Sequence, residues 1–129
     1  MTATHDLTLL LRHLRPVLHP EPYGFAVADA GHRVTAPFAV IAEAEGLTVI
    51  ATLAALNAAG LPGAEPMARI SMTVQSALTA VGLTAAMATA LAAQGISANV
   101  VAGFHHDHIL LPWDRRLAAM AALQALSDG

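Results

Sequence analysis

The chain has 129 residues, of which 56% are hydrophobic and 12% are charged, and its formal net charge is -3. Binding to nucleic acid requires a basic face, so this composition, which contains no lysine, argues against a nucleic-acid partner. The absence of cysteine excludes disulfides, thiolate metal sites and cysteine nucleophiles.

The sequence also gives no sign of export or membrane insertion. The N-terminal segment has neither a basic region nor a long apolar run, so we expect no secretory signal. The alanine-rich run from Thr84 to Ala93 is too short and too weakly hydrophobic to span a bilayer. We therefore expect a cytoplasmic protein without membrane contacts. The low charge also suggests that an oligomer buries part of the apolar surface.

The chain begins with a short predicted helix and three predicted strands. The helix starts at Asp6, carries one leucine stripe and ends at Pro16. The strands are predicted at 23–29, 38–43 and 47–51. The connector 30–37 is too short for a crossover helix, so the second strand should be antiparallel to the first or displaced from it.

A turn, a second helix and a linker complete the first half. Ala44 to Gly46 is predicted to be a hairpin turn with glycine at the strained position. Thr52 should cap a helix that carries Leu53 and Leu56, and Gly60 should end it. The segment 61–66 contains two prolines and a glycine, which favours a linker.

The second half has a clearer pattern of strand, helix, strand, strand and helix. A half-buried strand is expected at 69–75, and a helix with an apolar stripe should follow the turn Ser76 to Ala80 and end at Gly95. Strands are predicted at 96–102 and 109–111, with a histidine-rich turn between them. The last helix should be capped by Asp114, and its predicted inward residues are Leu117, Met120 and Leu123. A final strand is missing from this half.

The order of elements predicts the α+β class, with helices on one face of an antiparallel sheet. Residues 1–64 are interpreted as a degenerate half and residues 65–129 as a more complete one. A single α+β sandwich is the alternative.

The turn QSALTAVGL, residues 75–83, is the first candidate site. A strand that ends where a helix begins presents backbone N–H groups and the positive end of the helix dipole, where a carboxylate or phosphate can bind. Ser76 and Thr79 add hydroxyl groups, and Gly82 allows a close approach. The alternative is structural: Ser76 or Thr79 caps the helix and Gly82 serves packing.

Two further groups have weaker functional interpretations. His106 and His108, in the turn 105–108, could share a divalent metal ion, although solvated turn histidines are the commoner case. Glu43 and Glu45, beside Gly46, could act as an acid–base pair or bind an amino group, or could lie at a solvated hairpin tip. No P-loop, dinucleotide fingerprint, nucleophile elbow or zinc-protease motif is present, and enzyme activity has no positive support.

The stretch ISMTVQSALTAVGLTAAMATALAAQGISANVVAGFHHDHILLP resembles an ACT-like domain. It is especially similar to small bacterial proteins of uncharacterised function that consist of two ACT-like halves. The resemblance is carried by Ser76 to Leu83, Gly95 to Gly103 and His106 to Ile109, and upstream by EAEGLTVI, Glu43 to Ile50.

This resemblance implies two ferredoxin-like halves of βαββαβ type that bind an amino acid or a similar small molecule where paired units meet. It implies ligand contacts from the turn between the first strand and the first helix, and weaker ones from the hairpin of the facing unit. These residues are Ser76, Ala77, Thr79, Val81, Gly82 and Leu83 in the turn, with Glu45 and Gly46 in the hairpin.

The turn departs from many regulatory ACT domains, because it has Ala77, Leu78 and Val81 where acidic or amide residues and a proline are common. A small or apolar ligand therefore fits better than a polar amino acid. We expect a cytoplasmic, non-enzymatic, dimeric ligand-binding protein with no cofactor. The alternatives are a metal-binding protein that uses His106 and His108, and an interaction module that pairs through a sheet edge.

Overall fold

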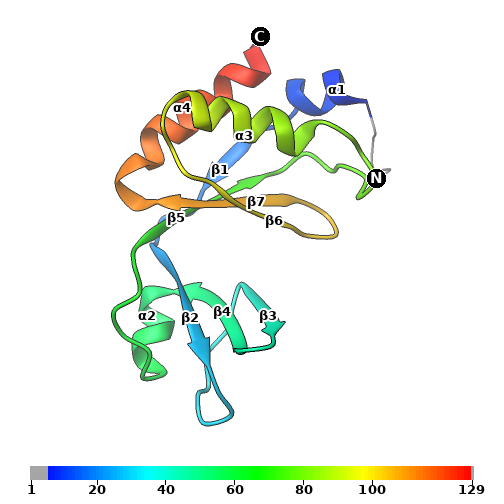
Figure 1. Ribbon diagram of the computed structural model, residues 1–129. Coiled ribbons are helices and arrows are strands. Elements are labelled where there is room, and N and C mark those ends of the chain that lie inside the picture. Colours follow the sequence, from blue (N-terminus) through cyan, green and yellow to red (C-terminus); the bar gives the residue numbers. More distant parts are fainter. Residues whose placement is uncertain (1–5, 129) are drawn as a thin grey trace. The chain divides into compact units, whose positions relative to one another are not determined.

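The computed structural model describes residues 6–128, which form two compact units (Figure 1). Unit 1 combines the chain up to His19 with the chain from Ala68 onward, and unit 2 is Pro20–Met67. The predicted halves divide the chain once, at 64/65, whereas these units divide it twice. The division into halves stays a prediction about sequence organisation. Both units are α+β with antiparallel strand pairing, as predicted.

The sheet of unit 1 uses strands from both ends of the chain. Its order is β1 (Pro16–Leu18), β5 (Met67–Met72), β7 (Asp107–Pro112) and β6 (Asn99–Ala102). β1 was not predicted as a strand; it runs antiparallel to β5, with Val17 opposite Ser71. The edge that the second half of the sequence leaves open is therefore filled by the N-terminal segment. The result is a ferredoxin-like unit.

Helices cover one face of this sheet (Figure 1). They are α1 (Leu7–Arg12), α3 (Leu83–Ala93) and α4 (Arg116–Asp128), the last preceded by a 3₁₀ turn, η1 (Trp113–Arg115). The backbone N–H of Leu9 donates to the Asp6 carboxylate at 3.3 Å, which makes Asp6 the N-cap residue and confirms the predicted start of the first helix. The fully buried core side chains come from helices and strands alike, namely Leu10, Leu14, Ile70, Met72, Met87, Leu91, Ile109, Leu111 and Leu123.

Two details predicted for the last helix are wrong. Asp114 does not cap it, because η1 precedes α4 and the residue before that 3₁₀ turn is Pro112. Leu117 is 71% exposed, whereas Ala119 and Leu123 are buried. The buried residues Ala119 and Leu123 are four positions apart and define the inward stripe, which puts Leu117 on the exposed side of α4. Gly95, at the end of α3, has the left-handed φ of +69° that its predicted position requires.

Unit 2 contains β2 (Tyr23–Ala28), β3 (Ala39–Glu43), β4 (Gly46–Thr52) and α2 (Leu53–Ala58), with the strand order β3-β4-β2. The second strand is thus displaced from the first, one of the two predicted arrangements. The predicted hairpin turn is also confirmed, because Glu43 pairs with Gly46, whose φ is +146°. The helix begins as predicted, with the Ala55 N–H donating to the Thr52 hydroxyl at 3.2 Å.

The core of unit 2 lies between α2 and one face of its three strands. Ala28, Val49, Ala51 and Leu56 form this core and are almost completely buried. The opposite face of the strands carries Phe25 and Val27, which remain 37% and 67% exposed. No helix among residues 6–128 is long and apolar enough to cross a membrane.

Unit 1 should lose stability when a core leucine of its N-terminal helix is truncated. Leu10→Ala should lower the free energy of unfolding by about 2–5 kcal/mol, because it leaves a cavity at a fully buried site. Leu9→Ala is the matched control, since Leu9 lies in the same helix but is 43% exposed. Urea unfolding monitored by circular dichroism measures both. Equal, small losses would mean that α1 is not part of the core of unit 1.

Candidate functional site

The turn between β5 and α3 leads to a helix start without a side-chain cap. Gly82 is the N-cap residue of α3, with φ +100°, and no side chain caps the helix there. Gly82, and neither Ser76 nor Thr79, is thus the N-cap residue, while the packing role that the structural alternative gave Gly82 is borne out by its contact with Leu7. The Ser76 hydroxyl instead donates to the Asp107 carboxylate at 3.5 Å.

Gly82 is required at this position for two reasons. Its left-handed backbone disfavours any other residue, and a Cβ atom there would lie 3.0 Å from the Cδ2 atom of Leu7. The turn thus packs directly on the N-terminal helix of unit 1. Packing against Leu7 also fixes the place where α3 begins.

The side chains of the turn divide into a buried and an exposed set. Leu83 is 3% exposed and belongs to the core, so only its backbone can face a ligand. Val81 and Leu78 are 83% and 67% exposed and give the turn an apolar outer surface. Ala77 accepts a hydrogen bond from the Ala80 N–H at 2.9 Å, which closes the loop before the helix.

The start of α3 provides positive potential without a charged side chain. The first intrahelical bond to Gly82 comes from the Ala86 N–H, so the N–H groups of residues 83–85 belong to the first turn of the helix. Aligned peptide dipoles make this end favourable for an anion. Nearby chemistry comes from Asp107, bonded to Ser76; burial raises the pKa of its carboxyl, and that hydrogen bond and His106 oppose the rise.

Glu45 and Gly46, the other predicted ligand residues, belong to unit 2. Glu45 occupies the β3–β4 turn and Gly46 is the first residue of β4. The predicted contacts thus come from two units, and a contribution of the hairpin to the site stays a prediction.

The histidines make a hydrogen-bonded chain that the sequence reasoning missed. Ser71 is 8% exposed, and its hydroxyl lies 2.9 Å from Nε2 of His19 and 2.7 Å from Nδ1 of His108. Burial, and then the charge of Arg69, lower the pKa of His108 to about 4 and also lower the pKa of His19. The strand that carries Ser71 was predicted to be half-buried, but it is buried on both faces. The only available signal for these hydrogen bonds was Ser71 itself, a polar residue in an otherwise largely apolar strand.

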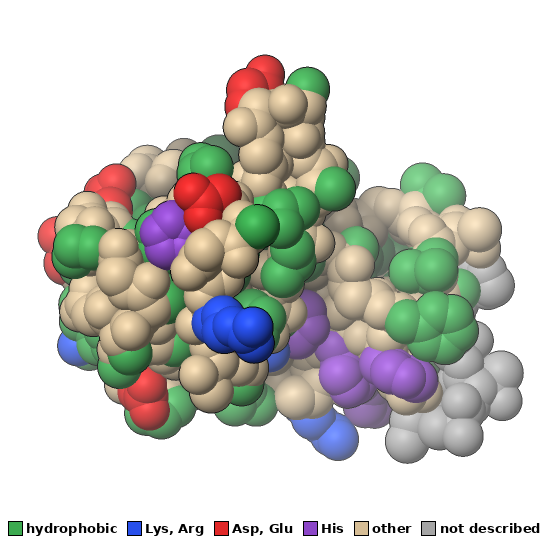
Figure 2. All heavy atoms as spheres, turned by 90° about the horizontal axis from the view of Figure 1, so that it is seen from below, with side chains coloured by type: hydrophobic (Ala, Val, Ile, Leu, Met, Phe, Trp, Pro, Cys, Tyr) green, Lys and Arg blue, Asp and Glu red, His purple; other side chains and the backbone are tan. Residues whose placement is uncertain are grey.

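A metal site at His106 and His108 would need a third ligand, and residues 6–128 do not provide one. His108 lies inside β7 and contacts Ser71, whereas Nδ1 of His106 lies 3.5 Å from the Val74 carbonyl oxygen. Within residues 6–128, no group of three or more His, Cys, Asp or Glu side chains is placed to hold a metal ion. Figure 2 shows histidine side chains gathered at the surface, where they border apolar, neutral polar and arginine side chains.

Comparison with known proteins identifies the family. Two family models described as ACT domain match the chain, at residues 2–68 and 65–125. The chain belongs to the ACT domain family, whose members are generally regulatory, small-ligand-binding modules rather than catalytic ones. No curated protein matches the sequence.

Solved structures agree with this fold. A protein of unknown function from Vibrio cholerae, described as a possible transport protein, is 38% identical over 90% of this chain and 92% of that chain, with a TM-score of 0.78. The regulatory subunit of aspartate kinase from Thermus thermophilus, in its ligand-free form, is 14% identical over 86% and 95% of the two chains, with a TM-score of 0.60. An Agrobacterium tumefaciens protein has a TM-score of 0.64 at 18% identity over 83% and 84%.

The lowered pKa of His108 predicts a specific dependence of stability on pH. The ordinary value is 6.5 and the folded value about 4, so the folded protein binds fewer protons than the unfolded chain between these limits. The contribution of His108 to stability is complete above pH 6.5 and is lost as the pH falls towards 4. His108→Asn should therefore flatten the fall in unfolding free energy over this window.

Urea unfolding at pH 7 and pH 4.5 measures this effect. His105→Asn is the matched control, because His105 lies in the same hairpin but is exposed. The raised pKa of Asp107 acts in the opposite direction, but both variants retain that residue. An equal pH dependence in the two variants would contradict the role assigned to His108.

Proposed function

We propose that this protein is a non-enzymatic regulatory ACT protein that binds a free amino acid at the turn from Ser76 to Leu83. The observation that carries the proposal is the start of α3, an 11-residue helix that begins at a left-handed glycine and lacks a side-chain cap. Membership of the ACT family supports a small ligand, and the resemblance of this turn to ACT ligand turns supports its location.

The chemistry of the turn suggests how an amino acid would be held. Its α-carboxylate would accept hydrogen bonds from N–H groups at the first turn of α3, where the helix dipole favours a negative charge. The backbone of Val81 and Gly82 borders this position, and the hydroxyls of Ser76 and Thr79 are additional partners. The Asp107 carboxylate, which accepts a hydrogen bond from Ser76 of the turn, would attract the α-ammonium group.

Ligand selectivity should follow from the apolar composition of the turn. Ala77, Leu78 and Val81 offer no charged or amide group to a ligand side chain. A small or apolar amino acid therefore gains contact area without leaving a polar group unpaired. This proposal includes pairing of two chains into a homodimer, with Glu45 and Gly46 of the hairpin as the second contact surface, and a cytoplasmic location.

Titration with the twenty amino acids by isothermal calorimetry tests this proposal. We expect at least one small or apolar amino acid to bind saturably. At a concentration one hundred times its dissociation constant, it should raise the free energy of unfolding by about 2.7 kcal/mol. A flat response across the panel, with protein shown to be folded, would count against the proposal.

Val81→Asp locates the site. The side chain is 83% exposed, so folding should be unaffected, and the new carboxylate would compete with that of the ligand for the start of α3. We expect affinity to fall about tenfold, which is about 1.4 kcal/mol. Leu117→Asp introduces the same charge at a 71% exposed position of α4 and is the matched control. Equal losses in both variants would place the ligand elsewhere.

A further inference from the structure

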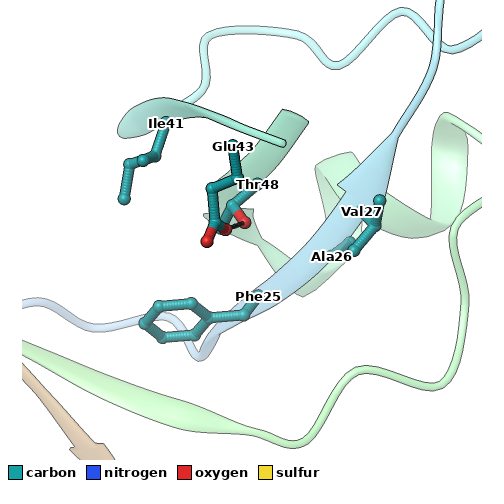
Figure 3. Close-up of a pocket in the computed structure, with 6 residues that line it drawn as sticks. All are labelled: Phe25, Ala26, Val27, Ile41, Glu43 and Thr48. Atoms are coloured by element: carbon teal, nitrogen blue, oxygen red, sulfur yellow. Dashed lines mark hydrogen bonds between the residues drawn. The ribbon is translucent and has the colours of Figure 1, made fainter. Parts of the chain in front are cut away.

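Unit 2 has a pocket on the face of its sheet that α2 does not cover. The pocket has a volume of about 410 Å³ and is lined by Phe25, Ala26, Val27, Ile41, Glu43 and Thr48 (Figure 3). All six residues come from β2, β3 and β4. This volume lies in the range of about 300–1,000 Å³ that is typical of small-molecule sites.

The walls of the pocket are apolar surface that the fold leaves unused. Phe25, Val27 and Ile41 are 37%, 67% and 45% exposed, although large apolar side chains on short strands usually face a core. The core of unit 2 lies on the opposite face, where Val49 and Ala51 pack with α2. Covering the three exposed side chains with an apolar ligand would therefore be favourable.

A single carboxylate lies among these walls and is held in place. The strand register puts Thr48 opposite Val27 on one side and opposite Ile41 on the other. Its hydroxyl donates to Oε1 of Glu43, which Figure 3 shows between Ile41 and Phe25. This hydrogen bond fixes the carboxylate while its second oxygen, Oε2, can accept from a ligand. No lysine or arginine lines the pocket.

We propose that this pocket binds a small organic cation, namely a primary ammonium group attached to a compact branched apolar body. The ammonium group donates to Glu43, and the apolar body lies against Phe25, Val27 and Ile41. The Phe25 ring adds attraction for a cation near its face. Because Glu43 is exposed, the ion pair alone would be weak, so affinity requires charge and apolar contact together.

This site is distinct from the one proposed at the start of α3. That turn favours an anion through backbone N–H groups, whereas this pocket favours a cation through a carboxylate. The start of α3 and this pocket belong to different units of the chain, and Glu45 and Gly46, the second contact surface of the first site, are not part of the pocket lining. Either one can be wrong without affecting the other.

Three ligands of the same shape test the proposal on the full chain at pH 7. They are 3-methylbutylamine, 3-methylbutan-1-ol and 3-methylbutanoate, which present a cation, a neutral group and an anion. Amide shifts in a two-dimensional nitrogen–proton NMR titration should saturate with the amine and map to β2, β3 and β4. We expect binding about fivefold weaker for the alcohol, which keeps the apolar contact but loses the exposed ion pair, and none for the carboxylate, which Glu43 repels.

Glu43→Gln should reduce the affinity for the amine about fivefold, to that of the alcohol, since glutamine still accepts from Thr48 but carries no charge. Glu65→Gln, at an exposed position of unit 2 outside the pocket lining, should leave it unchanged. Equal affinity for all three ligands, shifts confined to residues 76–85, or equal losses in both variants would overturn the proposal. If the amide signals of β2, β3 and β4 shift when only the protein concentration is raised, without ligand, a second copy of the chain covers this face and the proposal is overturned.

Discussion

The pairing of β1 with β5 is the interaction on which the organisation of unit 1 depends. β5 is buried on both faces and carries Ile70 and Met72 in the core. Without β1, the edge of β5 would present unpaired backbone groups next to that core. A three-residue strand from the other end of the chain satisfies them, and the N–H of Thr73 continues the contact by donating to the Leu14 carbonyl oxygen at 3.1 Å. The chain is thereby closed into one unit by residues more than fifty positions apart.

This closure also positions the candidate site. Once β1 is paired, Leu10 of α1 and Leu14, which follows the helix, are buried in the same core, and Leu7 packs against Gly82. Gly82 in turn sets where α3 begins, and the orientation of α3 determines where its dipole points. The ability of the turn to bind an anion therefore comes from the position of its backbone N–H groups. The hydrogen bond between the buried Ser71 and His108 stabilises β5 and β7. Acidification, which charges His108, weakens this support.

Local patterns were sufficient for most of the elements. The caps at Asp6 and Thr52 and the glycines at 46 and 95 follow from rules that involve only neighbouring residues. β1 could not be predicted in this way, because a three-residue segment that begins with a proline has no periodicity and the strand exists only through a distant partner. The hydrogen bonds of Ser71 with His19 and His108 are hidden for the same reason. In the candidate turn, the glycine was identified, but the absence of a side-chain cap required the structure.

The central claim is that the start of α3 holds the carboxylate of an amino acid. A crystal structure of the protein with the tightest-binding amino acid tests this claim most directly. The account predicts ligand density with its carboxylate oxygens within hydrogen-bonding distance of N–H groups of the first turn of α3, beside Gly82 and Val81. If the amino acid is fully occupied at a different site and only solvent lies at the start of α3, the central claim is contradicted.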